Sequence, residues 1–311
     1  MISIDRIDLE RLFQFELASK PASLYNKENG EARYTKSKSV IKRKLKVDVS
    51  ARTVSKPDVA VIDGGGMLHA AIYWPTEGIV QDLIDGIEKY ICSFINFADV
   101  YLVFDRYFEF SIKSDTRTER INSLLRAHTL SLEGPLPRKD TCMSSNETKE
   151  QLINIIAKEL SVRMRAKKFT HKFVVTSKQP VPVETQYGQM SKRVDLKSDY
   201  DEADYIIPQH VNAAINENCK SVFVICIDTD VFLLLCHHFF NRKWTSNVYM
   251  KDFTSDTTTI TCIRSTVERH QAIIPYLLAC HSLTGCDTVP NLHNIGKSKA
   301  LASVKNVPLI R

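Results

Sequence analysis

Acidic residues recur along the sequence at the points where apolar segments end. They are Asp63 after VAVI, Asp105 after YLVF, Glu202 and Asp204 in DEADY, Asp228 and Asp230 after VFVICI, and Asp287 in LTGCDTVP. A cluster of carboxylates is unfavourable unless cations neutralise it, and oxygen ligands without histidine or cysteine select Mg²⁺ or Mn²⁺ over Zn²⁺. Two such ions about 3.5–4 Å apart would activate water and stabilise the charge that develops during attack on a phosphodiester.

Each of these acids also has an ordinary structural role open to it. An aspartate after a strand is commonly a turn residue or a helix N-cap, and acids in a first helical turn complement the macrodipole. That explanation covers DEAD at 201–204 without any binding site. Asp228 and Asp230 are harder to explain, because alternate residues of an extended chain point to the same side and two carboxylates there would repel.

The elements that must position the acids follow from the pattern after Pro57. The sequence predicts strands at 58–63, 99–105, 172–177, 221–230 and 247–250, and helices at 78–96, 146–168 and 201–217. Nearly continuous apolar strands separated by helices are typical of an α/β fold whose parallel sheet is covered on both faces. Ligands bind outside the carboxyl ends of such strands, so we expect the acids to converge at one edge.

In chain order, the acidic segments resemble motifs of the flap-endonuclease (XPG/FEN-type) branch of the PIN-like 5′-nucleases. VAVIDGGGMLH and YLVFDRY resemble its first two strands, DEADY is similar to its Glu-Ala-Glu element, CIDTDVFLL resembles its Asp-x-Asp strand end, and LTGCDTVPNLHNIGKSKAL is similar to its Gly-Cys-Asp turn and helix-hairpin-helix. The resemblance covers residues 58 to 305. It implies a PIN/FEN-like parallel sheet flanked by helices, a helical arch-like insertion at 106–145 and a C-terminal helix-hairpin-helix at 282–305.

The resemblance implies a metal-dependent 5′-nuclease acting on DNA, with flapped or branched structures as expected substrates. It assigns two Mg²⁺ or Mn²⁺ ions to Asp63, Asp105, Glu202, Asp204, Asp228, Asp230 and Asp287. The first six are the expected catalytic carboxylates.

The resemblance also implies contacts to the nucleic acid from basic residues. In the arch, Lys113 and Arg120 are assigned to the scissile phosphate, with Arg117 one helical turn from each, although basic residues on a helix commonly form a solvated face. In the hairpin, Gly296 can adopt positive φ at a helix start, and Lys297 and Lys299 would add charge beside a backbone phosphate. An ordinary interhelical loop is the alternative there.

Residues 1–57 are predicted to form a basic N-terminal extension ahead of a nuclease domain at 58–311. Their basic residues gather between Lys36 and Lys56, which suits a phosphate-contacting arm, a localisation signal or a solvated linker. Flap-type relatives begin close to the first strand, so this extension is a departure from the family pattern. So is Asp204, which stands where the family has glutamate.

Other functions remain open on the sequence alone. Asp-Thr-Asp-Val at 228–231 also suggests the Asp-x-Asp-x-[Thr/Val] motif of haloacid-dehalogenase-type phosphatases, but in that family this strand comes first rather than fourth. A PIN-type nuclease of single-stranded RNA and a non-catalytic, nucleic-acid-binding PIN-like scaffold are the remaining alternatives. The net charge of +6 is compatible with a nucleic-acid partner but does not require one. The lack of a signal-like or membrane-spanning run predicts an intracellular protein. The basic arm and the expected DNA substrate favour the nucleus if the source is eukaryotic.

Overall fold

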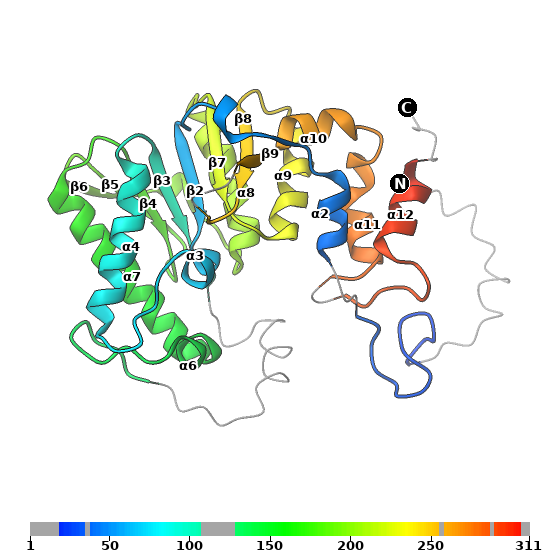
Figure 1. Ribbon diagram of the computed structural model, residues 1–311, viewed down its shortest axis with the longest axis horizontal. Helices are drawn as coiled ribbons and strands as arrows, with labels where there is room; N and C mark the ends of the chain where they lie inside the picture. The colour runs from blue at the N-terminus through cyan, green and yellow to red at the C-terminus, as the bar shows by residue number, and fades with distance from the viewer. Residues whose placement is uncertain (1–18, 35–37, 107–127, 255–257, 287–288, 306–311) are drawn as a thin grey trace. The chain divides into compact units, whose positions relative to one another are not determined.

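The computed structural model describes residues 19–34, 38–106, 128–254, 258–286 and 289–305, which fall into two compact units (Figure 1). The larger unit spans Lys42–Leu278 and carries the sheet. The smaller unit combines the chain up to Ile41 with the chain from Ala279. None of the helices in the described ranges is long and apolar enough to cross a membrane.

Within the described residues, nine strands form one mixed sheet in the order β1-β9-β8-β7-β2-β3-β4-β5-β6. The five middle strands run parallel and are β8 (Asn247–Lys251), β7 (Ser221–Ile225), β2 (Val59–Asp63), β3 (Asp99–Val103) and β4 (Phe173–Thr176). The outer strands pair antiparallel and are β1 (Asp48–Ser50), β9 (Thr259–Cys262), β5 (Val183–Gln186) and β6 (Gln189–Lys192). The predicted strands are present, but the sheet is only largely parallel.

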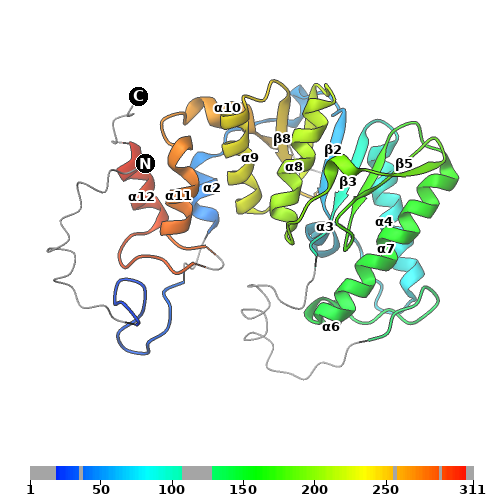
Figure 2. The same ribbon diagram turned by 180° about the vertical axis from the view of Figure 1, so that it is seen from behind.

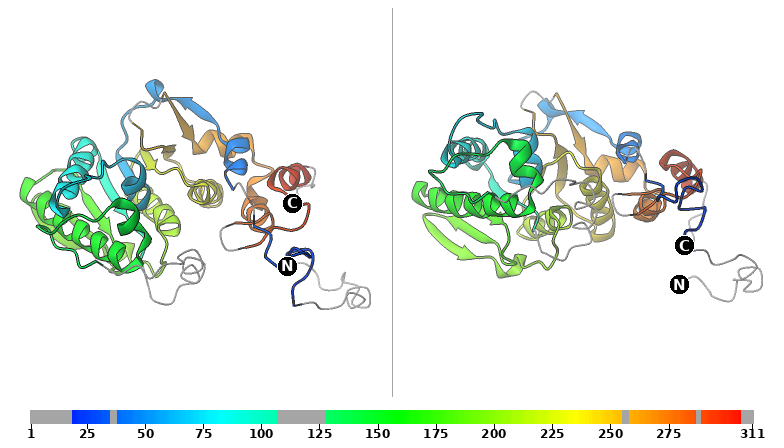
Figure 3. Two further views of the ribbon diagram at one scale, coloured as in Figure 1. Left: turned by 60° about the horizontal axis from the view of Figure 1, so that its bottom comes forward. Right: turned by 90° about the horizontal axis from the view of Figure 1, so that it is seen from below.

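Helices cover both faces of this sheet, as an α/β fold requires. On one face, α4 (Val80–Ile95) and α7 (Asn146–Lys167) pack against each other and against β3 and β4 (Figures 1 and 3). On the other face, α8 (Ala203–Asn216) packs against β2, β3 and β7, and α9 (Thr229–Arg242) packs against α8 (Figure 2). The helices predicted at 78–96, 146–168 and 201–217 are therefore confirmed.

Alternation along the strands divides the core between the two helical layers. Leu102 and Val175 belong to the apolar cluster that contains α4 and α7, whereas Tyr101 packs edge-on against the ring of His210 in α8. Successive residues of a strand point to opposite faces, so a strand buried on both faces must be apolar throughout. This explains why the central strands lack polar alternation.

The remaining elements are short and lie at the ends and connections of the main ones. They are α2 (Ser39–Leu45), η2 (Ala51–Thr53), α3 (Gly64–Ala70), α6 (Lys139–Ser144), η3 (Val194–Leu196), α10 (Ile263–Arg269), η4 (Ile274–Tyr276), α11 (Leu277–Leu283) and α12 (Lys297–Lys305). β1 belongs to the segment predicted as an extension, yet it pairs with β9 in the sheet. The arch-like insertion falls largely on residues 107–127, outside the described residues. The arch, the helix-hairpin-helix and the domain boundary at residue 57 stay predictions.

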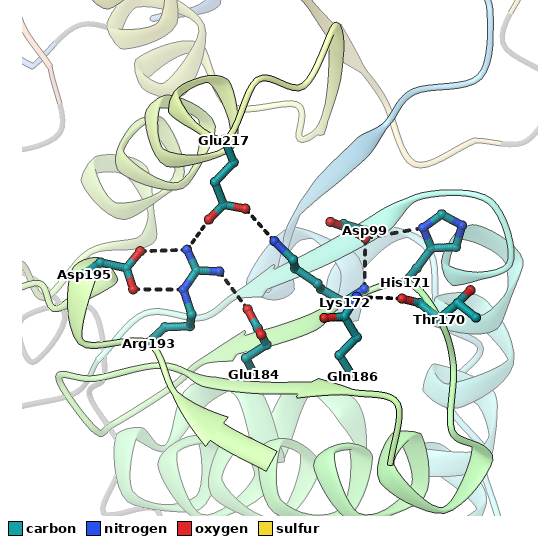
Figure 4. A network of polar contacts seen from close by, with 9 residues as sticks. All are labelled: Asp99, Thr170, His171, Lys172, Glu184, Gln186, Arg193, Asp195 and Glu217. Atoms are coloured by element: carbon teal, nitrogen blue, oxygen red, sulfur yellow. Dashed lines mark hydrogen bonds and ion pairs between the residues drawn. The ribbon is translucent and has the colours of Figure 1, made fainter. Parts of the chain in front are cut away.

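Ion pairs around Arg193 fix the β5–β6 hairpin to the rest of the sheet (Figure 4). Arg193 contacts Glu184 of β5 at 2.7 Å, Asp195 at 2.7 Å and also Glu217, which in turn contacts Lys172 at 2.6 Å. Because Lys172 precedes β4 and Glu217 ends α8, this network lies at the amino ends of the parallel strands. It is therefore at the edge opposite to the predicted acidic site.

Candidate metal site at the carboxyl edge of the sheet

The order of the strands by itself places several predicted acids together. β3 and β4 lie on one side of β2, whereas β7 and β8 lie on the other side. Such a switch point opens a crevice outside the carboxyl ends of the strands, where ligands of open α/β sheets bind. Asp63 ends β2, Asp105 follows β3, and Asp228 follows β7. These three acids therefore lie at the switch point.

Asp204, Asp228 and Asp230 form the closest group of acids in the described structure. Each offers one carboxylate oxygen, and these oxygens lie within 4.8 Å of one another. Asp204 is in the first turn of α8, Asp228 is the N-cap of α9, and Asp230 is in the first turn of α9. The amino ends of both helices thus face the same point, where their macrodipoles favour negative charge.

The local structure around Asp228 differs from the prediction. The strand was predicted to continue to Asp230, but β7 ends at Ile225 and α9 begins at Thr229. The side chain of Asp228 accepts a hydrogen bond from the backbone N–H of Asp230 at 2.7 Å. The two carboxylates are therefore brought together by a helix start, and not by the alternation of an extended chain.

Asp63 lies beside this group at the end of β2. Its carboxylate accepts hydrogen bonds from the N–H of Gly66 at 2.9 Å and from the thiol of Cys226 at 3.3 Å. Burial raises the pKa of Asp63, and the nearby carboxylates of Asp105 and Asp228 raise it further. Repulsion of this kind is what a bound cation would relieve.

Glycines after Asp63 make room for this arrangement. A Cβ atom on Gly64 would lie 2.4 Å from the ring of Phe104, and one on Gly66 would lie 2.7 Å from both the Asp63 carboxylate and the Phe253 ring. The close approach, rather than an unusual backbone angle, requires glycine at these two positions.

Asp105 and Glu202 are placed at the same edge, at the junction of β3 with α8. The Oδ1 atom of Asp105 accepts the N–H of Ala203 at 2.9 Å, and Glu202 is the N-cap residue of α8. Neither belongs to the group of three aspartates within 4.8 Å. Of the predicted acids, Asp287 lies outside the described residues, as do Lys113, Arg117 and Arg120 of the predicted arch.

The predicted phosphate contact at Gly296, Lys297 and Lys299 lies within the described residues. Gly296 precedes α12, but positive φ in this segment occurs at Gly285 (88°) and Asn294 (59°) instead, so that detail of the prediction was wrong. Lys299 is exposed, whereas Lys297 is buried and donates to the carbonyl of Gly285 at 2.7 Å. The contact of Gly296, Lys297 and Lys299 with a phosphate stays a prediction. The burial of Lys297 does not support a phosphate contact by that residue.

Three residues beside the acids were missed by the sequence reasoning. Lys42 donates from Nζ to the carbonyl of Ile227 at 2.9 Å, and burial lowers its pKa although Cys226 and Asp228 oppose that shift. Cys226 donates to Asp63, and Arg106 is buried directly after Asp105. None of the three carried a local signal, because each is placed by contacts between segments far apart in the sequence.

The described donor set fits a hard divalent cation. The three clustered aspartates are partly buried and contribute carboxylate oxygens alone. Mg²⁺ and Mn²⁺ prefer such ligands, whereas Zn²⁺ sites in proteins usually include histidine or cysteine.

In its fold, this chain is similar to the FEN/XPG-type 5′-nucleases. No protein-family model and no curated protein matches the sequence. Among solved structures, it is similar to the catalytic core of Rad2 in complex with DNA substrate, with a TM-score of 0.46 and 11% identity over 86% of this chain and 66% of that one. It is also similar to human GEN1 in complex with Holliday junction DNA (TM-score 0.47, 12% identity, 86% of this chain and 55% of that one).

Flap endonuclease-1 from Methanococcus jannaschii is a third similar structure, with a TM-score of 0.45 and 14% identity over 84% of this chain and 75% of that one. All three likenesses concern the fold alone, at TM-scores below 0.5 and identities of 11–14%. The chain spans about two thirds of the Rad2 core, at 66%, and about half of the GEN1 chain, at 55%.

Proposed function

We propose that the chain is a divalent-metal-dependent 5′-nuclease that hydrolyses phosphodiester bonds in DNA, with flapped or branched structures as substrates. The observation that carries the proposal is the meeting of Asp204, Asp228 and Asp230 within 4.8 Å at the carboxyl edge of the sheet. Asp63 and Asp105 come from the two neighbouring strands at the same switch point. A purely structural origin would not require acids from four separate segments to converge.

The carboxylates fall into two groups in this proposal, one for each ion. Mg²⁺ or Mn²⁺, when bound, supplies a lowered pKa for the attacking water and offsets the charge that develops on the phosphate. Asp204, Asp228 and Asp230 would hold one ion, while Asp63 and Asp105 would extend the site towards a second. The helix starts of α8 and α9 aim the first three carboxylates, since Asp204 and Asp230 lie in first helical turns and Asp228 is an N-cap.

Further residues enter the proposal from the family resemblance alone. Glu202 and Asp287 would complete the ligand set. Lys113, Arg117 and Arg120 would contact the phosphate of a single strand, and Gly296 and Lys299 would contact the backbone of the adjoining duplex. Such contacts position the substrate without reading its sequence.

Cleavage assays with matched substrates test the proposal. Purified protein would be incubated with labelled flap, duplex and single-stranded DNA and with RNA, in Mg²⁺, in Mn²⁺ and in EDTA. We expect cleavage of flap DNA that requires metal and that falls about 10²–10³-fold in Asp228→Asn, equivalent to several kcal/mol of transition-state stabilisation. Asp85→Asn, which changes an exposed carboxylate of α4, is the matched control and should keep full activity.

Other outcomes distinguish the alternatives. Cleavage confined to RNA would replace the proposal by a PIN-type RNA nuclease. Metal-independent DNA binding without cleavage would indicate a nucleic-acid-binding scaffold. If Asp228→Asn cleaved as fast as the unsubstituted protein, the proposed site would be wrong.

A further inference from the structure

Arg106 is a buried arginine at the acidic edge, with only 4% of its surface exposed. Its guanidinium donates to backbone carbonyl oxygens on every side. Nε donates to Ser177 at 3.1 Å, Nη1 to Tyr200 at 3.2 Å and to Ser198, and Nη2 to Pro180 at 3.2 Å. A buried guanidinium is unfavourable unless its donors are satisfied, so this set of carbonyls is a requirement for its burial.

The carbonyls belong to two stretches of loop, which are joined directly by one main-chain bond, from the N–H of Ser198 to the carbonyl of Pro180 at 3.1 Å. Ser177 and Pro180 follow β4, whereas Ser198 and Tyr200 lead into α8. Loops lack the ladder of hydrogen bonds that fixes strands, and their positions depend on such side-chain contacts. Arg106 therefore joins the loop after β4 to the loop before α8.

The backbone next to Arg106 makes further bonds to the same loop. The N–H of Arg106 donates to the carbonyl of Asp201 at 2.6 Å, and Oδ1 of Asp105 accepts the N–H of Ala203 at 2.9 Å. Asp105 and Arg106 are thus bonded to residues 198–203 through two side chains and one main-chain group. The next residue along is Asp204, a member of the acidic group.

The bonds made by Asp105 and Arg106 act against the repulsion between clustered carboxylates. The carboxylate of Asp204 lies near those of Asp228 and Asp230, so without an opposing force the start of α8 would move away from the start of α9. A segment that must be ordered by the incoming ion lowers the affinity for that ion, because ordering has an entropic cost. A segment that is already ordered has no such cost and does not lower the affinity for the ion.

We infer that Arg106 is a positioning residue of the metal site: it fixes residues 198–203 so that Asp204 reaches Asp228 and Asp230 before a cation binds. This inference rests on the proposed function for the identity of the site. Arg106 contacts neither substrate nor ion in this role. Lysine cannot replace it, since a single ammonium group cannot reach carbonyls on both loops in the way that a planar guanidinium does.

The test measures the binding of Mn²⁺ to the full chain in the absence of nucleic acid. The concentration of free Mn²⁺ is monitored by its electron paramagnetic resonance signal. We expect Arg106→Lys to raise the dissociation constant about 10- to 100-fold, the range found for residues that orient metal ligands. Arg193→Lys is the matched control, because it removes another multiply bonded guanidinium, which lies at the opposite edge of the sheet. It should lower the melting temperature and leave Mn²⁺ affinity within about twofold.

Chemical rescue separates positioning from general stability. Millimolar guanidinium added to Arg106→Ala should restore Mn²⁺ affinity, whereas it should not restore that of Asp228→Asn. If Arg106→Ala does not fold, Arg106→Lys decides the matter. Unchanged Mn²⁺ affinity in folded Arg106→Lys would overturn the inference.

The outcomes also separate this inference from the proposed function. Mn²⁺ binding that depends on Arg106, without cleavage of any nucleic acid, would overturn the nuclease proposal and leave the role of Arg106 intact. Mn²⁺ binding by neither the unsubstituted protein nor any variant would overturn both.

Discussion

Acidification should weaken the larger unit through His210, a histidine of α8 with none of its surface exposed. Its ring packs edge-on against Tyr101 at 5.7 Å, and its Nε2 atom lies 2.6 Å from the hydroxyl of Thr176. Burial lowers the pKa of His210 from 6.5 to about 3. The folded protein therefore keeps this imidazole neutral at pH values where an unfolded chain would protonate it.

The sign and the size of the effect follow from this difference. Below pH 6.5 the unfolded state binds one more proton at His210 than the folded state does, so the free energy of unfolding falls as the pH falls towards 3. Each pH unit within this window contributes about 1.4 kcal/mol. From neutral pH to pH 5, His210 alone should therefore remove about 2 kcal/mol of stability.

Urea unfolding from pH 8 to pH 5 measures this contribution when it is compared with His210→Gln. Glutamine has no proton to gain in this range, so its cost of about 2 kcal/mol at pH 8 should shrink to nearly nothing at pH 5. Ile207→Val is the control, since it alters a buried apolar residue of the same helix and should cost about 1 kcal/mol at every pH. A cost of His210→Gln that stayed constant with pH would refute the reasoning.

Three further predictions concern the acidic edge and the β5–β6 hairpin. Gly66→Ala would place a Cβ atom 2.7 Å from the Asp63 carboxylate, so we expect weaker Mn²⁺ binding and slower cleavage. Gly65→Ala, whose Cβ atom would have its nearest contact at 3.4 Å, should behave like the unsubstituted protein in both assays. Arg193→Met removes the centre of an ion-pair network and should lower the free energy of unfolding by about 2–3 kcal/mol, measured by urea unfolding at pH 7; no loss would show that the network contributes nothing. Gly188→Ala forces alanine to a φ of 76° and should cost about 1–2 kcal/mol in the same measurement, and a stabilised variant would contradict the assigned turn.

The central elements and the acids at their ends were predictable because buried strands and helices have recognisable apolar patterns in the sequence. β2, β3, β4 and β7 are apolar over nearly their whole length, and the helices between them have one apolar face. Since parallel strands end at a common edge, the convergence of Asp63, Asp105 and Asp228 followed from the element order. The division of the core between two helical layers followed from the same pattern.

The outer strands have a much weaker apolar pattern in the sequence. β6 is exposed at all four positions, and β1 has three residues, so neither shows the apolar run of a buried strand. The β5–β6 hairpin depends on its two-residue turn, where Tyr187 and Gly188 have φ of 50° and 76° as in a type I′ turn. Tyrosine at the first turn position is an uncommon signal, and it did not predict the hairpin.

Contacts between distant segments were out of reach for a different reason. The bonds of Arg106 join residues 71 to 94 positions away, and no periodicity or motif records them. Lys297 shows the same difficulty, because its charge and its glycine neighbour suggested an exposed phosphate contact, whereas its ammonium group lies inside the smaller unit. Whether a basic side chain is buried depends on partners that only the fold brings together.

The two roles open to the aspartates, helix cap and metal ligand, prove compatible. Asp228 caps α9 through the N–H of Asp230, Asp63 caps α3 through the N–H of Gly66, and both sit at the acidic edge. A carboxylate has about four acceptor positions, so a capping bond occupies a fraction of its capacity and fixes its direction. Asparagine caps a helix about as well as aspartate but carries no charge. Asp228→Asn should therefore retain the free energy of unfolding, which Asp228→Ala should lower, and should lose Mn²⁺ binding. Mn²⁺ binding that survived in Asp228→Asn would show that capping was the only role of Asp228.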